Sequence, residues 1–151
     1  MPALFIAPII AGVQAILAKY MPGLLAGSGF VPFTGYAKTF VGQTVNPPEC
    51  WVMPVRTPID DEGNTYKETH LVTIKFSITG SEPDDLDDAA MAYCAAIHNA
   101  IEAAQPADWG AVIPLHAHVF EHDYGPVYQR DGVTAKFPEV HLEVEVQEVI
   151  D

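Results

Sequence analysis

Two stretches of the chain alternate between apolar and polar side chains, and this alternation constrains the fold more than any other feature. A period of two places alternate residues on opposite faces of a β-strand. One buried and one wet face is typical of an antiparallel sheet packed on a single side. The apolar positions are Val72, Ile74, Phe76 and Ile78 in the first stretch and Val140, Leu142, Val144 and Val146 in the second.

Two other segments carry apolar residues at helical spacing. The first covers residues 6–20, and Pro22 with Gly23 is predicted to end it. The second follows Ser81, which is predicted to cap a helix with an acidic first turn and an end at residues 105–107. Its apolar stripe consists of Leu86, Ala90, Tyr93, Ile97, Ala100, Ile101 and Ala104.

The remaining strands are predicted to form hairpins. The segment CWVMPVR at 50–56 precedes the acidic turn IDDEGN and the alternating stretch 66–79, and Pro54 favours an edge or bulged position. The segment from residue 111 to 126 pairs with 137–149 across a region that contains the turn dipeptide Asp131-Gly132. The fold class is therefore α+β: a single antiparallel or mixed sheet of about four to five strands with two main helices packed on one face. With no repeat and no linker, residues 1–151 are predicted to form one domain.

Residues 28–49 mix glycine, proline and aromatic residues, which predicts an irregular arm or short edge strands. Phe30, Phe33, Tyr36 and Phe40 lie in this arm. Aromatic side chains are common anchors at interfaces, so these residues either pack on their own sheet or dock on an adjacent copy.

The charge balance argues against nucleic-acid binding. The chain has 20 acidic and 7 basic side chains, a net charge of -13, which repels phosphates. The apolar N-terminal stretch has no basic segment before it and stops at Lys19, so it is interpreted as a retained helix with no membrane anchor. Cys50 and Cys94 lack ligand-like neighbours and are expected to be buried thiols.

The one cluster that suggests metal chemistry is His116, His118 and His122, with Glu121, Asp123 and His141 expected nearby. The ligands of the alternative metal site are His116, His118 and His141. Two histidines at positions i and i+2 of a strand share a face, and a partner strand can add a third ligand. The stretch GAVIPLHAHVFEHDYG also resembles part of the first cupin motif, but Glu121 is misplaced and no second motif follows. A metal-binding cupin-like enzyme is therefore kept as the alternative function.

No other catalytic pattern is present in the sequence. It has no GxSxG elbow and no GxGxxG or GxxxxGK[ST] phosphate loop, so no nucleophile and no cofactor is predicted. The paired acids at 60–61, 84–85 and 87–88 are better explained by a turn and a helix start. The chain is predicted not to be an enzyme.

The order of elements resembles that of the tail-terminator, tail-completion and neck proteins of long-tailed phages and related contractile particles. The resemblance spans nearly the whole chain and rests on pattern. It is carried by an N-terminal amphipathic helix and by the segments NPPECWVMPVR, ETHLVTIKFSITGSEPDDL, HVFEHDYGPVYQRDG and EVHLEVEVQEV.

This resemblance implies a virion structural protein, assembled in the host cytoplasm, that closes into a hexameric ring at the head-proximal end of the tail. The implied partners are copies of itself, the tail tube protein and neck or connector proteins, while DNA passes through without specific binding. A ring needs two different contact patches on each subunit. The residues predicted to supply them are Phe30, Phe33, Tyr36, Phe40, Asp60 and Asp61.

Overall fold

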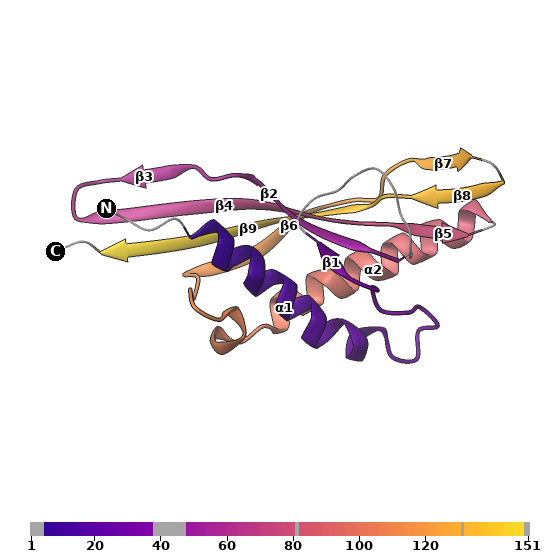
Figure 1. The fold of residues 1–151 in the computed structure, drawn as a ribbon, viewed down its shortest axis with the longest axis horizontal. Coiled ribbons are helices and arrows are strands. Elements are labelled where there is room, and N and C mark those ends of the chain that lie inside the picture. The colour runs from indigo at the N-terminus through magenta and orange to yellow at the C-terminus, as the bar shows by residue number, and fades with distance from the viewer. Residues whose placement is uncertain (1–4, 38–47, 81, 131, 150–151) are drawn as a thin grey trace.

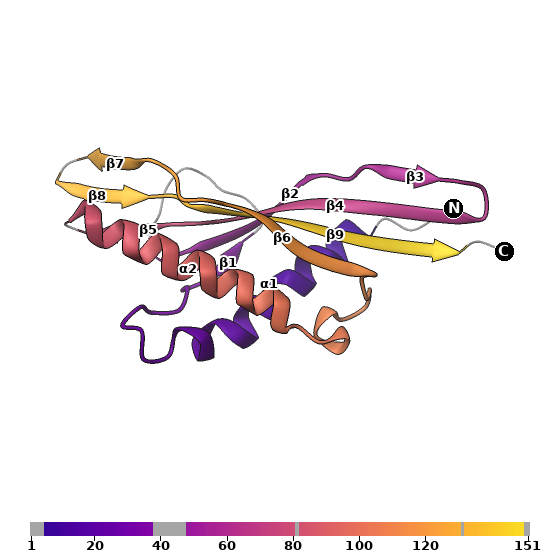
Figure 2. The ribbon, with the colours of Figure 1, turned by 180° about the vertical axis from the view of Figure 1, so that it is seen from behind.

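The computed structural model describes residues 5–37, 48–80, 82–130 and 132–149. In these residues two long helices lie on the same side of a twisted sheet, as Figures 1 and 2 show from opposite directions. The helices are α1 (Ile6–Leu25) and α2 (Pro83–Ala103), and a short 3-10 turn, η1 (Pro106–Trp109), follows α2. This arrangement confirms the predicted α+β class with both helices on one face.

The main sheet is mixed and six-stranded. Its order is β1-β2-β4-β9-β6, with β3 also paired to β4. Only the β1–β2 pair is parallel, and the other described pairs are antiparallel. The strands are β1 (Tyr36–Ala37), β2 (Cys50–Arg56), β3 (Ile59–Asp61), β4 (Thr65–Phe76), β6 (His116–Asp123) and β9 (Glu139–Val149).

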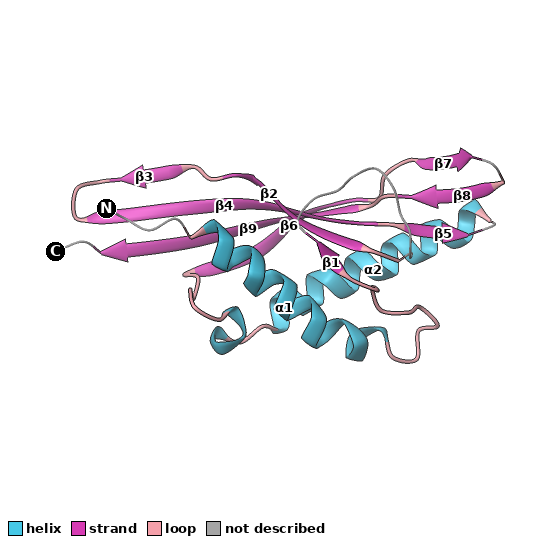
Figure 3. Ribbon diagram, in the orientation of Figure 1, coloured by secondary structure: helices cyan, strands magenta, loops and turns pink. Residues whose placement is uncertain are grey.

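A second sheet corrects the prediction of a single one. Its three strands, β5 (Ile78–Gly80), β7 (Val127–Arg130) and β8 (Val133–Lys136), pair in the order β5-β8-β7. These strands continue β4 and β6 or lead into β9, so the chain bends away from the main sheet at the Ser77 and Pro138 positions. Figure 3 shows this sheet at the opposite end of the long axis from β3. The Gly132 φ of 78° supports the predicted turn between β7 and β8.

The core lies between the main sheet and the two helices. The predicted apolar faces are confirmed: Val72, Ile74, Phe76, Val140, Leu142 and Val144 are at most 1% exposed. Ile78 is also buried, but it belongs to β5 of the second sheet. The predicted thiols Cys50 and Cys94 are both buried and unpaired, and burial raises the pKa of the Cys94 thiol to about 12.

Helix α1 extends further than predicted. Pro22 lies inside the helix, which ends at Leu25. Met21 and Leu25 are buried on the same side as the earlier apolar residues, and this packing outweighs the backbone hydrogen bond that proline cannot make. By length and composition α1 is the one helix among the described residues that resembles a membrane span, although here its apolar side packs in the core.

Helix α2 follows its predicted course. Its apolar stripe is confirmed, with Leu86, Ala90 and Ile97 among the buried residues. The helix begins at Pro83 with Glu82 at the N-cap, and the predicted cap, Ser81, lies outside the described residues. The second sheet is tied to this helix by Lys136, whose Nζ donates to Asp87 Oδ1 at 2.6 Å.

Candidate functional site

The predicted metal ligands His116 and His118 lie on the face of the main sheet that points away from the helices. Each faces a glutamate across the β6–β9 pair. His116 Nδ1 is 3.1 Å from Glu145 Oε2, and His118 Nε2 is 3.8 Å from Glu143 Oε2. Cross-strand pairs of polar side chains are an ordinary means of stabilising an exposed sheet face.

The third predicted ligand, His141, lies in a similar environment. Its Nε2 is 3.3 Å from Glu121 and 3.6 Å from Glu139, and its Nδ1 is 3.1 Å from Thr73 Oγ1. The histidines are therefore distributed along a ladder of acidic partners. Within the described residues, no three His, Cys, Asp or Glu side chains are grouped so that they could hold a metal ion. This geometry gives no support to the cupin-like alternative.

A β-bulge separates the other histidine of β6 from this ladder. The register of β6 on β9 shifts between Val119 and Glu121, so His122 pairs with Val140 and points toward the helices. There its Nε2 lies 3.0 Å from Nδ1 of His98 on α2. Strict alternation from His116 and His118 would have placed His122 on the outer face, and the bulge was not visible in the sequence.

A buried polar network on β4 was missed by the sequence analysis. Glu68 is 1% exposed and His70 is 0% exposed on the helix-facing side of the sheet. Tyr66 Oη donates to Glu68 Oε2 at 2.8 Å, and the Phe5 backbone N–H donates to Oε1 at 3.4 Å. The sequence could have revealed this network, because Tyr66, Glu68 and His70 lie on the same face of the strand as Val72, two residues apart.

His70 links this network to the loop after β2. Its Nδ1 lies 2.9 Å from Thr57 Oγ1, and its Nε2 lies 3.1 Å from Glu68 Oε1. The second contact is electrostatic, since Nε2 has no well-aligned hydrogen bond. Burial lowers the pKa of His70, and the neighbouring Glu68 carboxylate partly offsets that effect.

The order hydroxyl, imidazole, carboxylate invites comparison with a nucleophilic triad. A triad needs a substrate within reach of its hydroxyl, whereas the His70 ring is fully buried and lines none of the described cavities. The contacts instead join β4, the Thr57 loop and the backbone before α1. The network is therefore best explained as a structural one.

The aromatic arm packs largely on its own protomer. Phe33 is 8% exposed and stacks on Tyr93 of α2, with ring centroids 5.1 Å apart. Phe30 also contacts Tyr93, at 5.7 Å, and Tyr36 meets Phe33 edge to face at 6.0 Å. These contacts favour the first of the two alternatives for the arm, in which its aromatic residues pack on their own sheet. Phe40 lies outside the described residues.

The other predicted contact residues, Asp60 and Asp61, are exposed on β3. They lie at the end of the long axis opposite the second sheet (Figure 1). Val55 and Ile59, on the same edge of the main sheet, are also more than half exposed. Apolar and acidic side chains are thus presented together at this edge.

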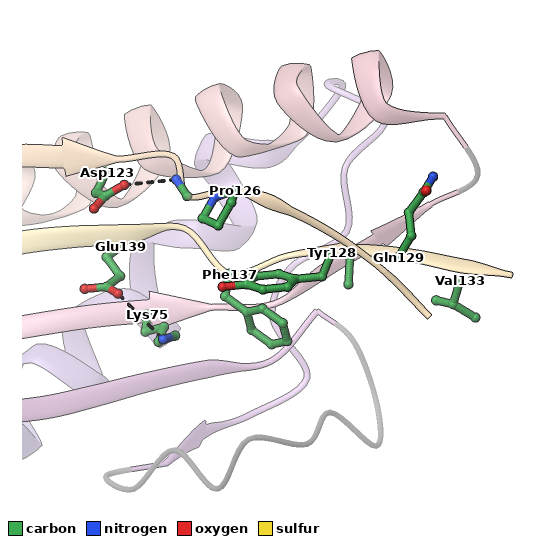
Figure 4. A pocket seen from close by; sticks show the side chains of 10 residues that line it. Lys75, Asp123, Pro126, Tyr128, Gln129, Val133, Phe137 and Glu139 are labelled. Atoms are coloured by element: carbon green, nitrogen blue, oxygen red, sulfur yellow. Dashed lines mark hydrogen bonds and ion pairs between the residues drawn. The ribbon is translucent and has the colours of Figure 1, made fainter. Parts of the chain in front are cut away.

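The second sheet carries a groove that was not predicted. The groove has a volume of about 630 Å³, and Figure 4 shows the Tyr128 and Phe137 rings side by side within it. Tyr128 is 54% exposed and Val133 is 52% exposed, so an apolar surface faces solvent here. Lys75 and Glu139 form an ion pair of 3.6 Å at its rim. Clustered apolar residues with a polar rim are typical of an interaction surface.

No family model matches the chain, and no curated protein matches its sequence. The fold is similar to a solved chain described as "Virion of native gene transfer agent (GTA) particle", with a TM-score of 0.67 and 12% sequence identity. The match covers 97% of this chain and 100% of that chain. At this level of identity, the similarity establishes that the two chains share a fold.

Proposed function

We propose that this chain is a structural protein of a virion and forms a homo-oligomeric ring that terminates a tail tube and joins it to the neck. The observation that carries the proposal is the end-to-end fold match to a chain of a gene transfer agent virion. A match over the whole length of both chains means that the element order, and not one shared motif, is common to them. The alternative position is in a neighbouring neck or connector ring.

The distribution of exposed side chains is consistent with ring assembly. A closed ring requires two different patches that meet between successive copies. The Tyr128–Val133 groove lies on the second sheet, and the edge carrying Ile59, Asp60 and Asp61 lies at the opposite end of the long axis. Phe30, Tyr36 and Phe40 of the arm remain candidates for additional contacts.

The charge of the chain fits a conduit for DNA. A net charge of -13 disfavours adhesion of phosphates, so DNA would pass through the ring without specific binding. The remaining partners in this proposal are the tail tube protein and a neck or connector protein. Assembly takes place in the host cytoplasm before the subunit enters the virion.

The test is the native mass of the purified protein by light scattering, followed by negative-stain electron microscopy with and without tail tubes. We expect a particle six times the mass of the 16.4-kDa chain, or a monomer that forms rings on added tubes. A particle that stays monomeric and binds no tube would contradict the proposal. The enzyme alternative is tested on the same sample by metal content, and it requires stoichiometric metal that is lost in His116→Ala/His118→Ala.

A pair of variants sharpens this test. Tyr128→Ser removes an exposed aromatic ring from the groove and should weaken ring formation while leaving the monomer folded. Met91→Ser is the matched control, because Met91 is 49% exposed on α2 and lies outside the groove. If both variants assemble as the unmodified protein does, the groove is not a ring contact.

A further inference from the structure

Two histidines from different elements face each other where α2 meets β6. His98 Nδ1 and His122 Nε2 are 3.0 Å apart, and their rings are nearly perpendicular, at 83°. Both residues lie on regular secondary structure, so the backbone fixes their separation. The arrangement depends on the bulge in β6, which turns His122 toward the helix.

A carboxylate lies behind the first of these rings. Glu102, one helical turn after His98, places Oε1 3.3 Å from His98 Nε2. A proton on Nε2 is therefore favoured, and the lone pair of Nδ1 is left to face His122. Metal-binding histidines commonly show this arrangement, with a carboxylate on the far ring nitrogen.

The hydrogen-bond distance between the two facing nitrogens means that one proton lies between them. A cation that replaces this proton accepts both lone pairs.

We propose that His98 and His122 form a binding site for a divalent transition-metal ion of the Zn²⁺, Ni²⁺ and Cu²⁺ class. Metal–nitrogen bonds of about 2.0–2.1 Å at angles of 90–109° place two ligand nitrogens roughly 2.8–3.4 Å apart. The observed separation of 3.0 Å lies within that interval. Mg²⁺ and Ca²⁺ are disfavoured because they prefer oxygen ligands.

The remaining coordination positions are assigned to water. Within the described part of the chain no third His, Cys, Asp or Glu completes a ligand set, so the protein supplies two ligands. The His98 side chain is 35% exposed, which gives solvent access to the pair. An ion held in this way links α2 to the edge strand β6 and stabilises the folded state, because the unfolded chain does not hold the two rings together.

The test uses the full chain after removal of metal with a chelator. ZnCl₂, NiCl₂ and CuCl₂ are titrated at pH 7.5, with calorimetry for stoichiometry and thermal melting for stabilisation. We expect one ion per chain, a raised melting temperature, and loss of both in His98→Ala and in His122→Ala. Glu102→Gln should weaken binding by about tenfold, the effect of losing a carboxylate behind a ligand.

The control is the double variant His116→Ala/His118→Ala, which removes two histidines from the outer face of the same strand. It should bind metal as the unmodified protein does. Loss of binding in this control, or retention of full binding in both His98→Ala and His122→Ala, would overturn the proposal. Absence of saturable binding in the unmodified protein would overturn it as well. None of these outcomes depends on ring assembly, so failure of the metal site leaves the proposed virion function untouched.

Discussion

The two faces of the main sheet carry the same kinds of polar side chain in opposite surroundings. On the helix face, Glu68 and His70 are at most 1% exposed and lie 3.1 Å apart. On the outer face, the His118 and Glu143 side chains are 47% and 32% exposed and lie 3.8 Å apart. Water screens the outer pair, whereas the inner pair has only its protein partners. The same residue types are therefore expected to contribute very differently to stability.

The largest effect is expected when the inner network loses its carboxylate. Glu68→Ala leaves the Tyr66 hydroxyl, the Phe5 N–H and the His70 ring without their common partner. A buried donor that loses its acceptor costs about 1–3 kcal/mol, so the loss of the acceptor shared by two donors is expected to cost about 2–5 kcal/mol in total. The free energy of unfolding, measured by urea denaturation at pH 7.5, should fall by that amount.

Glu143→Ala on the outer face is the matched control for this measurement. It removes a glutamate that faces a histidine on the same sheet but is one-third exposed. We expect a change within about 1 kcal/mol. If Glu68→Ala and Glu143→Ala lower the free energy of unfolding by similar amounts, burial does not determine how much these glutamates stabilise the fold.

The second-largest difference between the two faces is expected in how the free energy of unfolding depends on pH. Burial lowers the folded-state pKa of His70 below its ordinary value of 6.5. The unfolded chain therefore takes up this proton at a higher pH than the folded chain does. The stability due to the neutral buried ring is fully present above about pH 6.5 and is lost as the pH falls below that value.

The measurement compares unfolding free energies at pH 7.5 and pH 5.5. The unmodified protein should lose more stability over this interval than His70→Gln, which has no ring to protonate. If the unmodified protein and His70→Gln lose the same unfolding free energy between pH 7.5 and pH 5.5, groups other than His70 cause the acid sensitivity.

An intermediate effect is expected at Lys136 in the second sheet. Its side chain is 5% exposed, but that of its partner Asp87 is 55% exposed. Asp87→Ala should reduce the free energy of unfolding by roughly 1–2 kcal/mol, because the buried ammonium loses a charged hydrogen bond yet stays near solvent. Asp88→Ala, the neighbouring exposed acid, is the control and should change stability by less than about 0.5 kcal/mol. A loss at Asp87 as large as that of Glu68→Ala would contradict this ranking.

Much of the fold could be predicted because its signals are local. The alternation around Ile74 and Leu142 identified two strands and their buried faces, and the stripe around Ile97 identified α2. The second sheet was missed because its formation depends on where strands bend, at Ser77 and Pro138, which no periodicity records. The end of α1 was predicted too early because proline usually ends a helix. The helix continues past Pro22 because Leu25 is buried in the core.

The candidate sites were harder to predict because they depend on the register in which strands pair and on which face of a strand each side chain lies. The sequence grouped His116, His118 and His141 by their spacing along paired strands, but in the structure each lies beside acidic side chains. The bulge that joins His122 to His98 arises from strand pairing and has no signature in the residue types. The Glu68 network is in phase with the apolar face, but the predicted apolar face began at Val72 and did not include Glu68 or His70.

The smallest effect is expected at the outer ladder itself. His118→Ala should change the free energy of unfolding at pH 7.5 by no more than about 0.5 kcal/mol, because solvent-exposed pairs of this kind contribute little to stability. At low salt the contact between His118 and Glu143, 3.8 Å apart, is screened least, so the variant should be slightly less stable than the unmodified protein. Raising the salt concentration to 0.5 M should remove that difference. A difference that persists at high salt would mean that the outer face, like the inner one, holds its charges away from water.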